Sequence, residues 1–470
     1  MRDVNRAAAG AFLSGLLLTA PAMARDAAAP PTIDDAPASD KAGAQAGPPT
    51  PAPAAAEEEK LKHPDILDLT LSVEGELEAD ETPRSTHLSP QPSLPGWFGW
   101  KQRFEARTGI TFGGSYGVSW QNYSTSAFGD RDAVGHKFTF NASAALVNRG
   151  KPNALDLDVA IEDRRPLGTD FAPLEGGVRA GSGVPTAATW GDFSLGVTQA
   201  YVRQNLAAGK FQYAIGKLFA PNFVNAYPFF DDNRQFFNLA FATSPTIAVP
   251  LRGFGFVGTV FPGAGNAYAK AGMFTANSSD TGFTADEFFS RNEHFYFVEV
   301  GRTGFARQSV PIHARGPMDR DNFHVTLWYR DPLELREGES PGLSRPSPEA
   351  YGAAFNANFM AGDSVMWFLR GGLSQGGFAE ANMTGGFGWR PRSATSDLFG
   401  FGVGWTRPEV PDLGIPLPDL RDQYTIETFY RFHLLPIFAI TPGYQLLVHP
   451  SLAPSRDTLW VFSLRARLVF

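Results

Sequence analysis

Ionisable side chains alternate with apolar ones in several stretches of this chain, and their types indicate which chemistry they can do. Carboxylates accept hydrogen bonds from hydroxyl groups, and guanidinium groups donate hydrogen bonds to hydroxyl groups. Because acids and bases are mixed, the set produces no field of a single sign, which suits a neutral, hydroxyl-rich solute better than an ion. The residues placed in this way are Asp156, Asp158, Glu162, Arg164, Lys270, Glu299, Arg330, Glu427, Arg431, Arg465 and Arg467, with Arg370 in a stretch that alternates less regularly.

Aromatic residues share these stretches with the charges. Trp328, Phe295 and Phe297 are expected to face the same side, where an aromatic face can contact the apolar face of a pyranose ring. A simpler interpretation stays open for every one of these residues. In that interpretation the charges only solvate a wide channel and pair across neighbouring strands.

Two short motifs resemble catalytic or nucleotide-binding signatures. Residues 253–258 match G-x-G-x-x-G, but a dinucleotide site needs this motif between a strand and a helix, and here it lies within a Phe-rich strand pattern. Residues 372–376 match G-x-S-x-G, the nucleophile elbow, with His433 and His449 later in the chain. That stretch closes a strand instead of opening a helix, so both motifs are expected to be structural, and a barrel lipase remains the alternative.

Metal, cofactor and nucleic-acid sites are not predicted. The chain has no cysteine, and its eight histidines form no H-x-x-x-H or H-x-H pair. Asp231, Asp232 and Asn233 could ligate calcium, but a solvated polar loop is the preferred interpretation. A net charge of −8 argues against nucleic-acid binding, which needs a basic face.

Alternation with a period of two is the dominant pattern from Gly96 onward. Successive side chains of a strand point to opposite faces, so each segment has one polar and one apolar face. The segments are 10 to 13 residues or longer, enough for a tilted strand to cross a bilayer. The expected strands lie near 104–120, 134–148, 153–164, 191–207, 209–219, 252–261, 266–276, 293–303, 322–331, 350–360, 364–374, 379–390, 397–407, 422–434, 437–449 and 457–470.

An even number of about 16 strands predicts an all-β fold, a transmembrane antiparallel β-barrel. Long connections at 165–190, 220–251, 277–292, 304–321 and 332–349 are expected on one rim, opposite short turns. A soluble sandwich or propeller would also alternate, but with shorter strands and a polar outer face. The aromatic residues expected to form a girdle at the membrane surface are Trp120, Tyr123, Trp405, Tyr424 and Trp460.

The first 95 residues differ from the rest. Residues 1–24 have a basic start, a short apolar run and an Ala22-Met23-Ala24 ending, which predicts a signal peptide. Residues 25–95 are rich in Pro and Ala and bury too little apolar surface to fold alone, so a disordered periplasmic linker is expected. The barrel domain is assigned to residues 96–470.

Four blocks of the barrel region resemble the carbohydrate-selective (OprB-type) porins. They are residues 96–110, beginning Gly-Trp-Phe-Gly-Trp; residues 215–223; residues 370–372; and residues 422–470, which contain Thr441-Pro442-Gly443-Tyr444. The resemblance implies a sixteen-stranded channel for glucose-like sugars in the outer membrane of a Gram-negative bacterium. Residues 25–95 have no counterpart in that family, and Phe98 and Trp100 depart from its usual opening segment.

The expected function is therefore diffusion of small carbohydrates through a charged, aromatic-lined lumen, without enzymatic activity. The alternatives are a barrel enzyme of the lipase or protease type and a general, non-selective porin. The expected partners are small carbohydrates, outer-membrane lipid and the outer-membrane assembly machinery, with a homotrimer as a further possibility. A terminal aromatic residue, Phe470, resembles the signal that this machinery reads.

Overall fold

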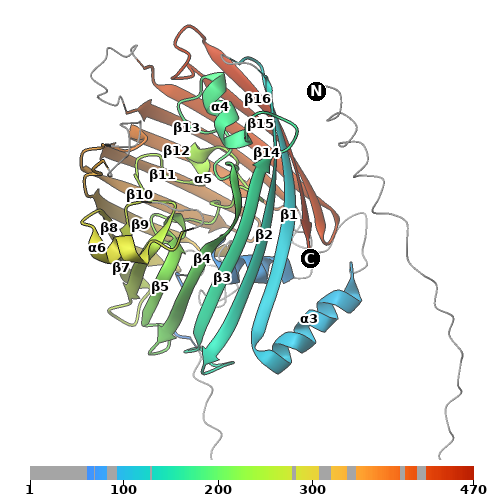
Figure 1. Cartoon of the computed structure of the whole chain (residues 1–470), viewed down its shortest axis with the longest axis vertical. Coiled ribbons are helices and arrows are strands. Elements are labelled where there is room, and N and C mark those ends of the chain that lie inside the picture. The colour runs from blue at the N-terminus through green and yellow to red at the C-terminus, as the bar shows by residue number, and fades with distance from the viewer. Residues whose placement is uncertain are drawn as a thin grey trace, which may run out of the picture. The chain divides into compact units, whose positions relative to one another are not determined.

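Sixteen strands pair edge to edge into one closed antiparallel barrel in the part of the chain that the structure describes (Figure 1). The computed structural model describes residues 61–67, 69–81, 93–126, 130–277, 282–305, 319–335, 346–391, 397–409 and 420–470. The strands are β1 (Ile110–Tyr123), β2 (Asp132–Val147), β3 (Leu155–Pro166), β4 (Phe193–Leu206), β5 (Phe211–Phe219), β6 (Arg252–Val260), β7 (Ala267–Thr275), β8 (His294–Thr303), β9 (Asn322–Arg330), β10 (Ala350–Ala361), β11 (Val365–Gln375), β12 (Ala379–Trp389), β13 (Leu398–Pro408), β14 (Gln423–Leu435), β15 (Phe438–Val448) and β16 (Thr458–Val469).

The barrel closes where the first strand meets the last. In this pair Ser119 lies opposite Arg465, and Trp120 lies opposite Leu464. Each of the sixteen expected segments overlaps one observed strand, so the predicted barrel is confirmed. Among the described residues, no helix is long and apolar enough to span a membrane.

The start of the first expected strand is wrong, because residues 104–108 are helical. They belong to α3 (Pro95–Thr108), and β1 begins only at Ile110. Gly109 separates the two elements with φ 78°, a left-handed conformation that ends helices and that glycine adopts without strain. Its amide donates to the carbonyl oxygen of Glu105 and so caps the helix.

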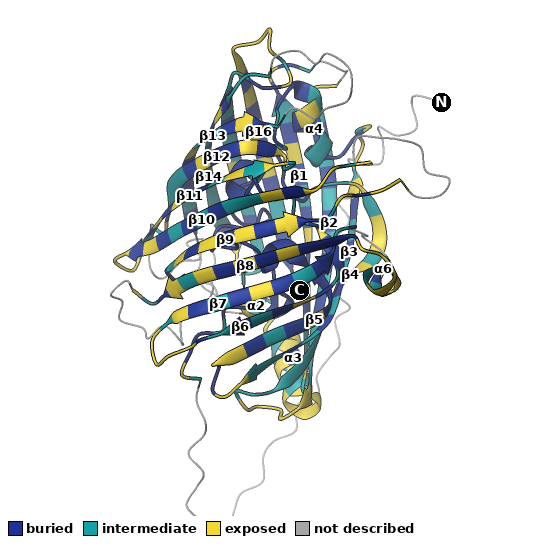
Figure 2. Ribbon diagram, turned by 90° about the vertical axis from the view of Figure 1, so that its left-hand side faces the viewer, coloured by how far each residue is buried: buried dark blue, intermediate teal, exposed yellow. Residues whose placement is uncertain are grey.

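Exposure alternates along the strands as the period of two predicts. On β9, Phe323, Val325 and Leu327 are exposed, while the residues between them are buried. Figure 2 shows the same alternation as exposed and buried bands along the neighbouring strands. The outer wall of the barrel is therefore apolar, and the polar parity faces the lumen.

One residue of the expected aromatic girdle is misplaced. Trp120, Tyr424 and Trp460 are exposed on the outer wall, and Trp405 is half-buried beside them. Tyr123 is 1% exposed, and its hydroxyl donates to Gln121 Oε1 (2.6 Å). It lies three residues after Trp120, so a strict alternation turns it to the inner face.

The connections divide between two rims. The short-turn rim carries 148–154, 207–210, 261–266, 362–364 and 436–437, together with the start of β1 and the end of β16. The connections that begin after β3, β5, β7 and β9 lie on the opposite, long-loop rim, as expected. The connection 304–321, in contrast, starts and returns at the short-turn rim, because antiparallel order places the end of β8 and the start of β9 there. That part of the prediction is wrong.

Three segments fill the lumen. They are residues 61–81, apart from position 68, with α2 (Val73–Glu81); residues 167–192 with α4 (Pro173–Ala180); and residues 220–251 with η1 (Ala220–Asn222) and α5 (Leu239–Ala242). The remaining described helix, α6 (Ala285–Ser290), lies in the connection after β7. The inner wall is therefore covered by chain from three places in the sequence.

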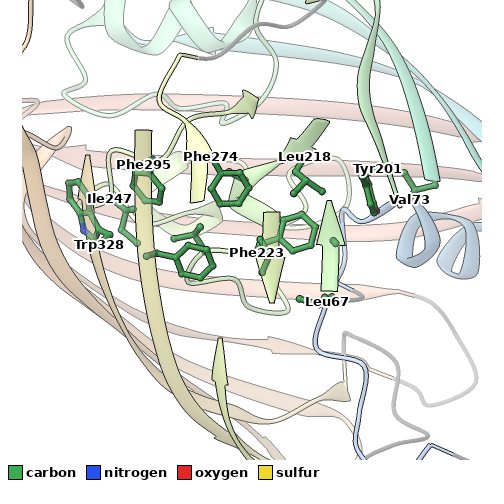
Figure 3. Packing of buried hydrophobic residues seen from close by; sticks show 14 of the residues in the cluster. Leu67, Val73, Tyr201, Leu218, Phe223, Ile247, Phe274, Phe295 and Trp328 are labelled. Carbon is green, nitrogen blue, oxygen red and sulfur yellow. The ribbon is translucent and has the colours of Figure 1, made fainter. Parts of the chain in front are cut away.

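The first of these segments does not fit the expected disordered linker. Leu67, Val73 and Leu77 are buried in the same cluster as residues of β4, β5 and the 220–251 segment. Figure 3 shows Leu67 and Val73 in this cluster with Tyr201, Leu218 and Phe223. Residues 61–81 lack the apolar content to fold alone, but the lumen supplies the missing apolar partners. The predicted signal peptide and residues 25–60 lie outside the described residues.

Candidate functional site

Every charged or aromatic residue proposed to line the pore lies on an inward-facing position of its strand. Asp156 and Arg431 are half-buried, and the others are buried between the wall and the luminal segments. By strand they are Asp156, Asp158, Glu162 and Arg164 on β3; Lys270 on β7; Glu299 on β8; Trp328 and Arg330 on β9; Arg370 on β11; Glu427 and Arg431 on β14; and Arg465 and Arg467 on β16.

Glu162 and Arg164 form one charged cluster on β3. Arg164 is ion-paired with Glu162, whose other oxygen accepts a hydrogen bond from the Thr198 hydroxyl (2.9 Å). Arg252 approaches the same carboxylate at 3.6 Å, and Lys137 at 4.0 Å. One carboxylate is thus surrounded by three cations from β2, β3 and β6.

A second cluster is centred on Glu299. Lys270 Nζ lies 2.7 Å from Glu299 Oε1, and the Tyr268 hydroxyl donates to the same oxygen at 3.0 Å. Glu299 Oε2 accepts from the Thr326 hydroxyl (2.9 Å) and from the backbone amide of Asn225 (3.1 Å). The cluster therefore ties three neighbouring strands to the 220–251 segment.

Glu427 and Arg465 hold the other end of that segment. Glu427 accepts hydrogen bonds from the backbone amides of Phe237 (2.6 Å) and Asn238 (2.9 Å). Arg465 donates to the carbonyl oxygen of Asp232 at 2.6 Å, and its guanidinium lies over the Phe237 ring at 4.6 Å. Both side chains bind backbone atoms, so they position the segment as well as contribute charge.

Arg370, Arg431 and Arg330 also bind loop backbone. Arg370 donates to the carbonyl oxygens of Thr243 and Asn225 (both 2.9 Å), and its guanidinium lies 3.9 Å from the centre of the Tyr227 ring. Arg431 donates to the carbonyl oxygen of Arg234 (3.3 Å). Arg330 donates to the carbonyl oxygen of Pro348 (2.7 Å).

The three aromatic residues point inward but are covered. Trp328 stacks on Phe295 with ring centres 5.8 Å apart, and Phe297 stacks on Phe274 at 6.1 Å. All four belong to the apolar cluster under the 220–251 segment. In this arrangement they support the segment and present no free ring face to a sugar.

Two further arginines of the inner wall, Arg203 and Arg467, form ion pairs with carboxylates of the 61–81 segment. Arg203 of β4 contacts Asp158 of the wall (3.3 Å), Asp65 (3.0 Å) and Glu74. Arg467 donates two hydrogen bonds to Asp80, at 2.9 and 2.7 Å. The segment is therefore bound by opposite charge to β4 and to β16, which lie four strands apart in the wall.

Asp156 borders open space near the short-turn rim. A cavity of about 430 Å³ lies there, and its lining includes Asp65, Glu74, Asp156, Arg203 and Arg320. This volume falls in the usual range for small-molecule sites, about 300–1,000 Å³. Acids and bases both reach it, as expected for the inner wall.

The surroundings shift the pKa values of two carboxyl groups on the 61–81 segment in opposite directions. Burial raises the pKa of Glu76 to about 7, although Arg234 acts against this shift. Burial would also raise the pKa of Asp65, but Arg203, Asn205 and Arg320 together lower it below its ordinary value. Asp65 therefore stays charged, while Glu76 changes its charge near neutral pH.

The sequence-based prediction omitted several residues that pair with the predicted ones. The polar parity of the strands would have included Lys137 and Arg203, had it been applied to β2 and β4. The acidic run at residues 74–81 was a visible signal, but nothing local shows that its carboxylates lie inside the barrel. Asp232 and Arg234 belong to a loop with no strand periodicity.

The remaining motifs are structural where they can be placed. Residues 253–258 lie within β6, and the Ser374 hydroxyl donates to the carbonyl oxygen of Ala379 across the turn after β11. Asp231 and Asp232 do not form a solvated loop, because the segment folds into the lumen and buries both. Asp231 pairs with Arg234. Asp232 accepts from the Thr189 hydroxyl (2.6 Å). Within the described ranges, no group of three metal-ligating side chains comes together.

Comparison with known proteins gives one family match and several structural matches. The family described as carbohydrate-selective porin, OprB family, matches residues 354–470. No curated protein matches the chain by sequence. The high-pH structure of Pseudomonas putida OprB is similar with a TM-score of 0.61 and 14% identity, covering 82% of this chain and 99% of that one. A mutant porin of Rh. blastica gives a TM-score of 0.43 and 8% identity, covering 77% of this chain and 100% of its own.

The structural likeness at this identity establishes the fold, and the family match covers the last six to seven strands. Both agree with the closed barrel, its apolar outer wall and its polar inner wall. The chain therefore folds as a porin-like β-barrel, and its residues 354–470 match the family described as carbohydrate-selective porin, OprB family.

Proposed function

We propose that small neutral carbohydrates diffuse through this barrel along its polar inner wall. The observation that best supports this is the mixed sign of the wall, where acids and bases lie within a few ångströms of one another, as in the Lys270–Glu299 pair at 2.7 Å. Such a wall offers hydrogen-bond acceptors and donors to hydroxyl groups, and its charges largely cancel. A neutral, hydroxyl-rich solute gains these contacts without the cost of crossing a field of one sign.

The proposed route passes the cavity beside Asp156, where the lumen has open volume. From there it follows the inner wall, where Asp156 and Arg431 are the half-buried residues of the predicted set. The buried ones act on the solute through their charges and through the luminal segments that they hold. The 61–81 and 220–251 segments narrow this route, since both are bound to the wall through buried ion pairs and hydrogen bonds. Selectivity is then set as much by these segments as by the strands.

Conductance in planar bilayers, with glucose as a blocker, tests the proposal. Glucose should lower the current reversibly at concentrations where a charged sugar acid of similar size, gluconate, has less effect. Vesicle swelling should likewise be faster with glucose than with gluconate. If swelling follows solute size alone and glucose does not reduce the current, the protein is a general porin.

We further propose that the protein acts as a channel and not as an enzyme. The matched structures are porins, which agrees with a channel. A Ser374→Ala variant should conduct like the original protein. Hydrolysis of a soluble ester by the purified protein that disappears in Ser374→Ala would support the barrel-enzyme alternative instead.

Processing, assembly and oligomeric state complete the proposal. Cleavage after Ala24 should give a mature chain that begins at Arg25, which N-terminal sequencing checks. Insertion by the outer-membrane assembly machinery and association as a homotrimer are the expected fate of the exported chain. The mass of the detergent-purified protein distinguishes a trimer from a monomer.

A further inference from the structure

Helix α3 lies against the outer wall of the barrel, beside the start of β1 (Figure 1). Trp97, Trp100 and Phe104 follow one another at helical spacing and stack, with ring centres 5.2 and 5.6 Å apart. All three contact the Phe112 ring edge-on, at 5.7 to 6.3 Å. Phe112 is on the outward parity of β1, so the aromatic face of α3 joins the apolar outer wall.

The helix is fixed in this position at its middle and at its C-terminal end. Lys101 is 4% exposed, and its Nζ lies 3.0 Å from Glu81 Oε1, at the end of the luminal helix α2. At the C-terminal end, Arg149 of the β2–β3 turn donates to the carbonyl oxygens of Glu105, Ala106 and Arg107. The aromatic face is therefore held beside the wall.

Although packed together, the indoles remain open to the surroundings. Trp97 is 37% exposed and Trp100 is 43% exposed, and Leu94 and Ile110 on either side of the helix are exposed as well. In water this would leave a continuous apolar strip unfavourably solvated. Tryptophan prefers the boundary between acyl chains and headgroups, where its ring is buried and its N–H is hydrated.

The charges of the helix fit the same boundary. Arg103 and Arg107 are exposed, and Glu105 is the one acid within the helix. Basic residues beside an apolar helix face are typical of helices that lie in a membrane surface and attract anionic lipids. The start of β1 is on the short-turn rim, which faces the periplasm in outer-membrane barrels.

We propose that α3 is a membrane-surface helix that lies in the headgroup layer of the periplasmic leaflet. Trp97, Trp100 and Phe104 extend the lipid-facing wall of β1 into that layer. Arg103 and Arg107 bind the phosphate groups of anionic phospholipids. The occupant of this surface is thus phospholipid, and the surface continues the lipid contact that the barrel wall already makes.

The absence of cysteine from the sequence makes a spin-label test direct. Nitroxides are placed on the full chain at Trp100→Cys, at Gln102→Cys, which lies on another face of α3, and at Leu327→Cys on the lipid-facing wall of β9. The proteins are reconstituted in vesicles of phosphatidylethanolamine and phosphatidylglycerol. Collision of each label with oxygen, which enters the bilayer, is compared with collision with a water-soluble nickel chelate.

The label at position 100 should resemble the one at position 327, with oxygen favoured, while the label at position 102 should favour nickel. A nickel-accessible label at position 100 would place α3 in water, and a label shielded from both reagents would show that protein covers the helix. Either result overturns the proposal. If Trp100→Cys fails to fold, Gly96→Cys replaces it, because an added Cβ there meets no atom within 4 Å.

A second measurement tests the role of charge. When phosphatidylglycerol replaces neutral lipid, the oxygen preference at position 100 should increase. It should no longer respond to lipid charge when Arg103→Gln and Arg107→Gln are added. An unchanged response in the double variant would contradict phosphate binding by these two arginines.

Discussion

Asp80 of the luminal helix α2 and Arg467 of the closing strand β16 form a two-bonded ion pair across 387 residues of sequence. Arg234 of the 220–251 segment approaches the same carboxylate at 3.6 Å. Such planar, doubly bonded pairs are among the stronger polar contacts in proteins. Helix α2 is thereby attached both to the wall and to another luminal segment, so its displacement requires these contacts to break together.

Replacing Asp80 should loosen this attachment. Asp80→Asn keeps the shape but removes the charge, and losing a charge-assisted hydrogen bond costs about 1.5–3 kcal/mol. The equilibrium constant for α2 leaving the wall should then rise about 10- to 100-fold. Single-channel recording should show a larger or more variable conductance. Glu78→Gln is the matched control, since it removes the same charge from an exposed position of α2, and an equal effect of both variants would argue against a specific attachment.

Conductance should depend on pH through Glu76. Its pKa is about 7 when α2 is docked, against an ordinary value of 4.5, so the docked state binds the proton more tightly. Protonation of Glu76 therefore contributes its full stabilisation of docking below pH 4.5. This contribution decreases as the pH rises towards 7 and is lost above that pH. The groups that face Glu76 include Asp80, Lys137, Asn141, Asp231, Arg234 and Arg467.

Recordings between pH 4.5 and pH 7 should show conductance rising with pH, and Glu76→Gln should remove this rise. Asp65 acts in the opposite direction. Because its pKa in the docked state is lowered, its charge stabilises docking at pH values above its ordinary pKa of 3.8, and this stabilisation is lost only in stronger acid. Its titration therefore lies outside the window. A pH dependence that persists in Glu76→Gln would assign the effect to another group.

Variants of the inner wall should alter selectivity without unfolding the barrel. Arg465→Ala should shift ion preference toward cations, and Glu427→Ala toward anions, and both should weaken block by glucose. Glu427→Ala also leaves the amides of Phe237 and Asn238 without their partner, at a cost of about 1–3 kcal/mol, so the 220–251 segment should become more mobile.

Leu464→Ala is the control for this pair of variants. Leu464 is one residue from Arg465 but faces outward with 45% of its surface exposed, so both selectivity and block should stay nearly unchanged. A change of glucose block in Leu464→Ala, together with none in Arg465→Ala, would mean that the inner wall has been assigned to the wrong parity.

Deletion of Phe470 should reduce assembly more than conductance per channel. The residue extends the pairing of β16 with β1, because its amide and carbonyl groups both bond to Gly114 (3.0 and 3.2 Å). Its ring stacks on Phe138 of β2 at 6.2 Å. The amount of heat-modifiable protein on unboiled gels should fall, and normal amounts would count against the prediction.

The strands and their two faces were determined by the sequence alone. A strand that separates lipid from a polar lumen must alternate with a period of two, and this constraint acts on each segment independently. Leu464 and Arg465 could therefore be assigned to opposite faces from their neighbours alone. Alternation did not reveal the helix that ends at Gly109, and it places Tyr123 on the inner face and not in the girdle.

What fills the lumen was decided only by the tertiary structure. Residues 61–81 look like part of a linker because their apolar and acidic side chains have no partners nearby in the sequence. Closure of the barrel brings Arg203, Arg234 and Arg467 from distant parts of the chain to face them, and only then does burial outweigh the entropy of ordering the segment. The periodicity of a strand specifies which way a side chain points, but the partner that it meets depends on the whole closed barrel.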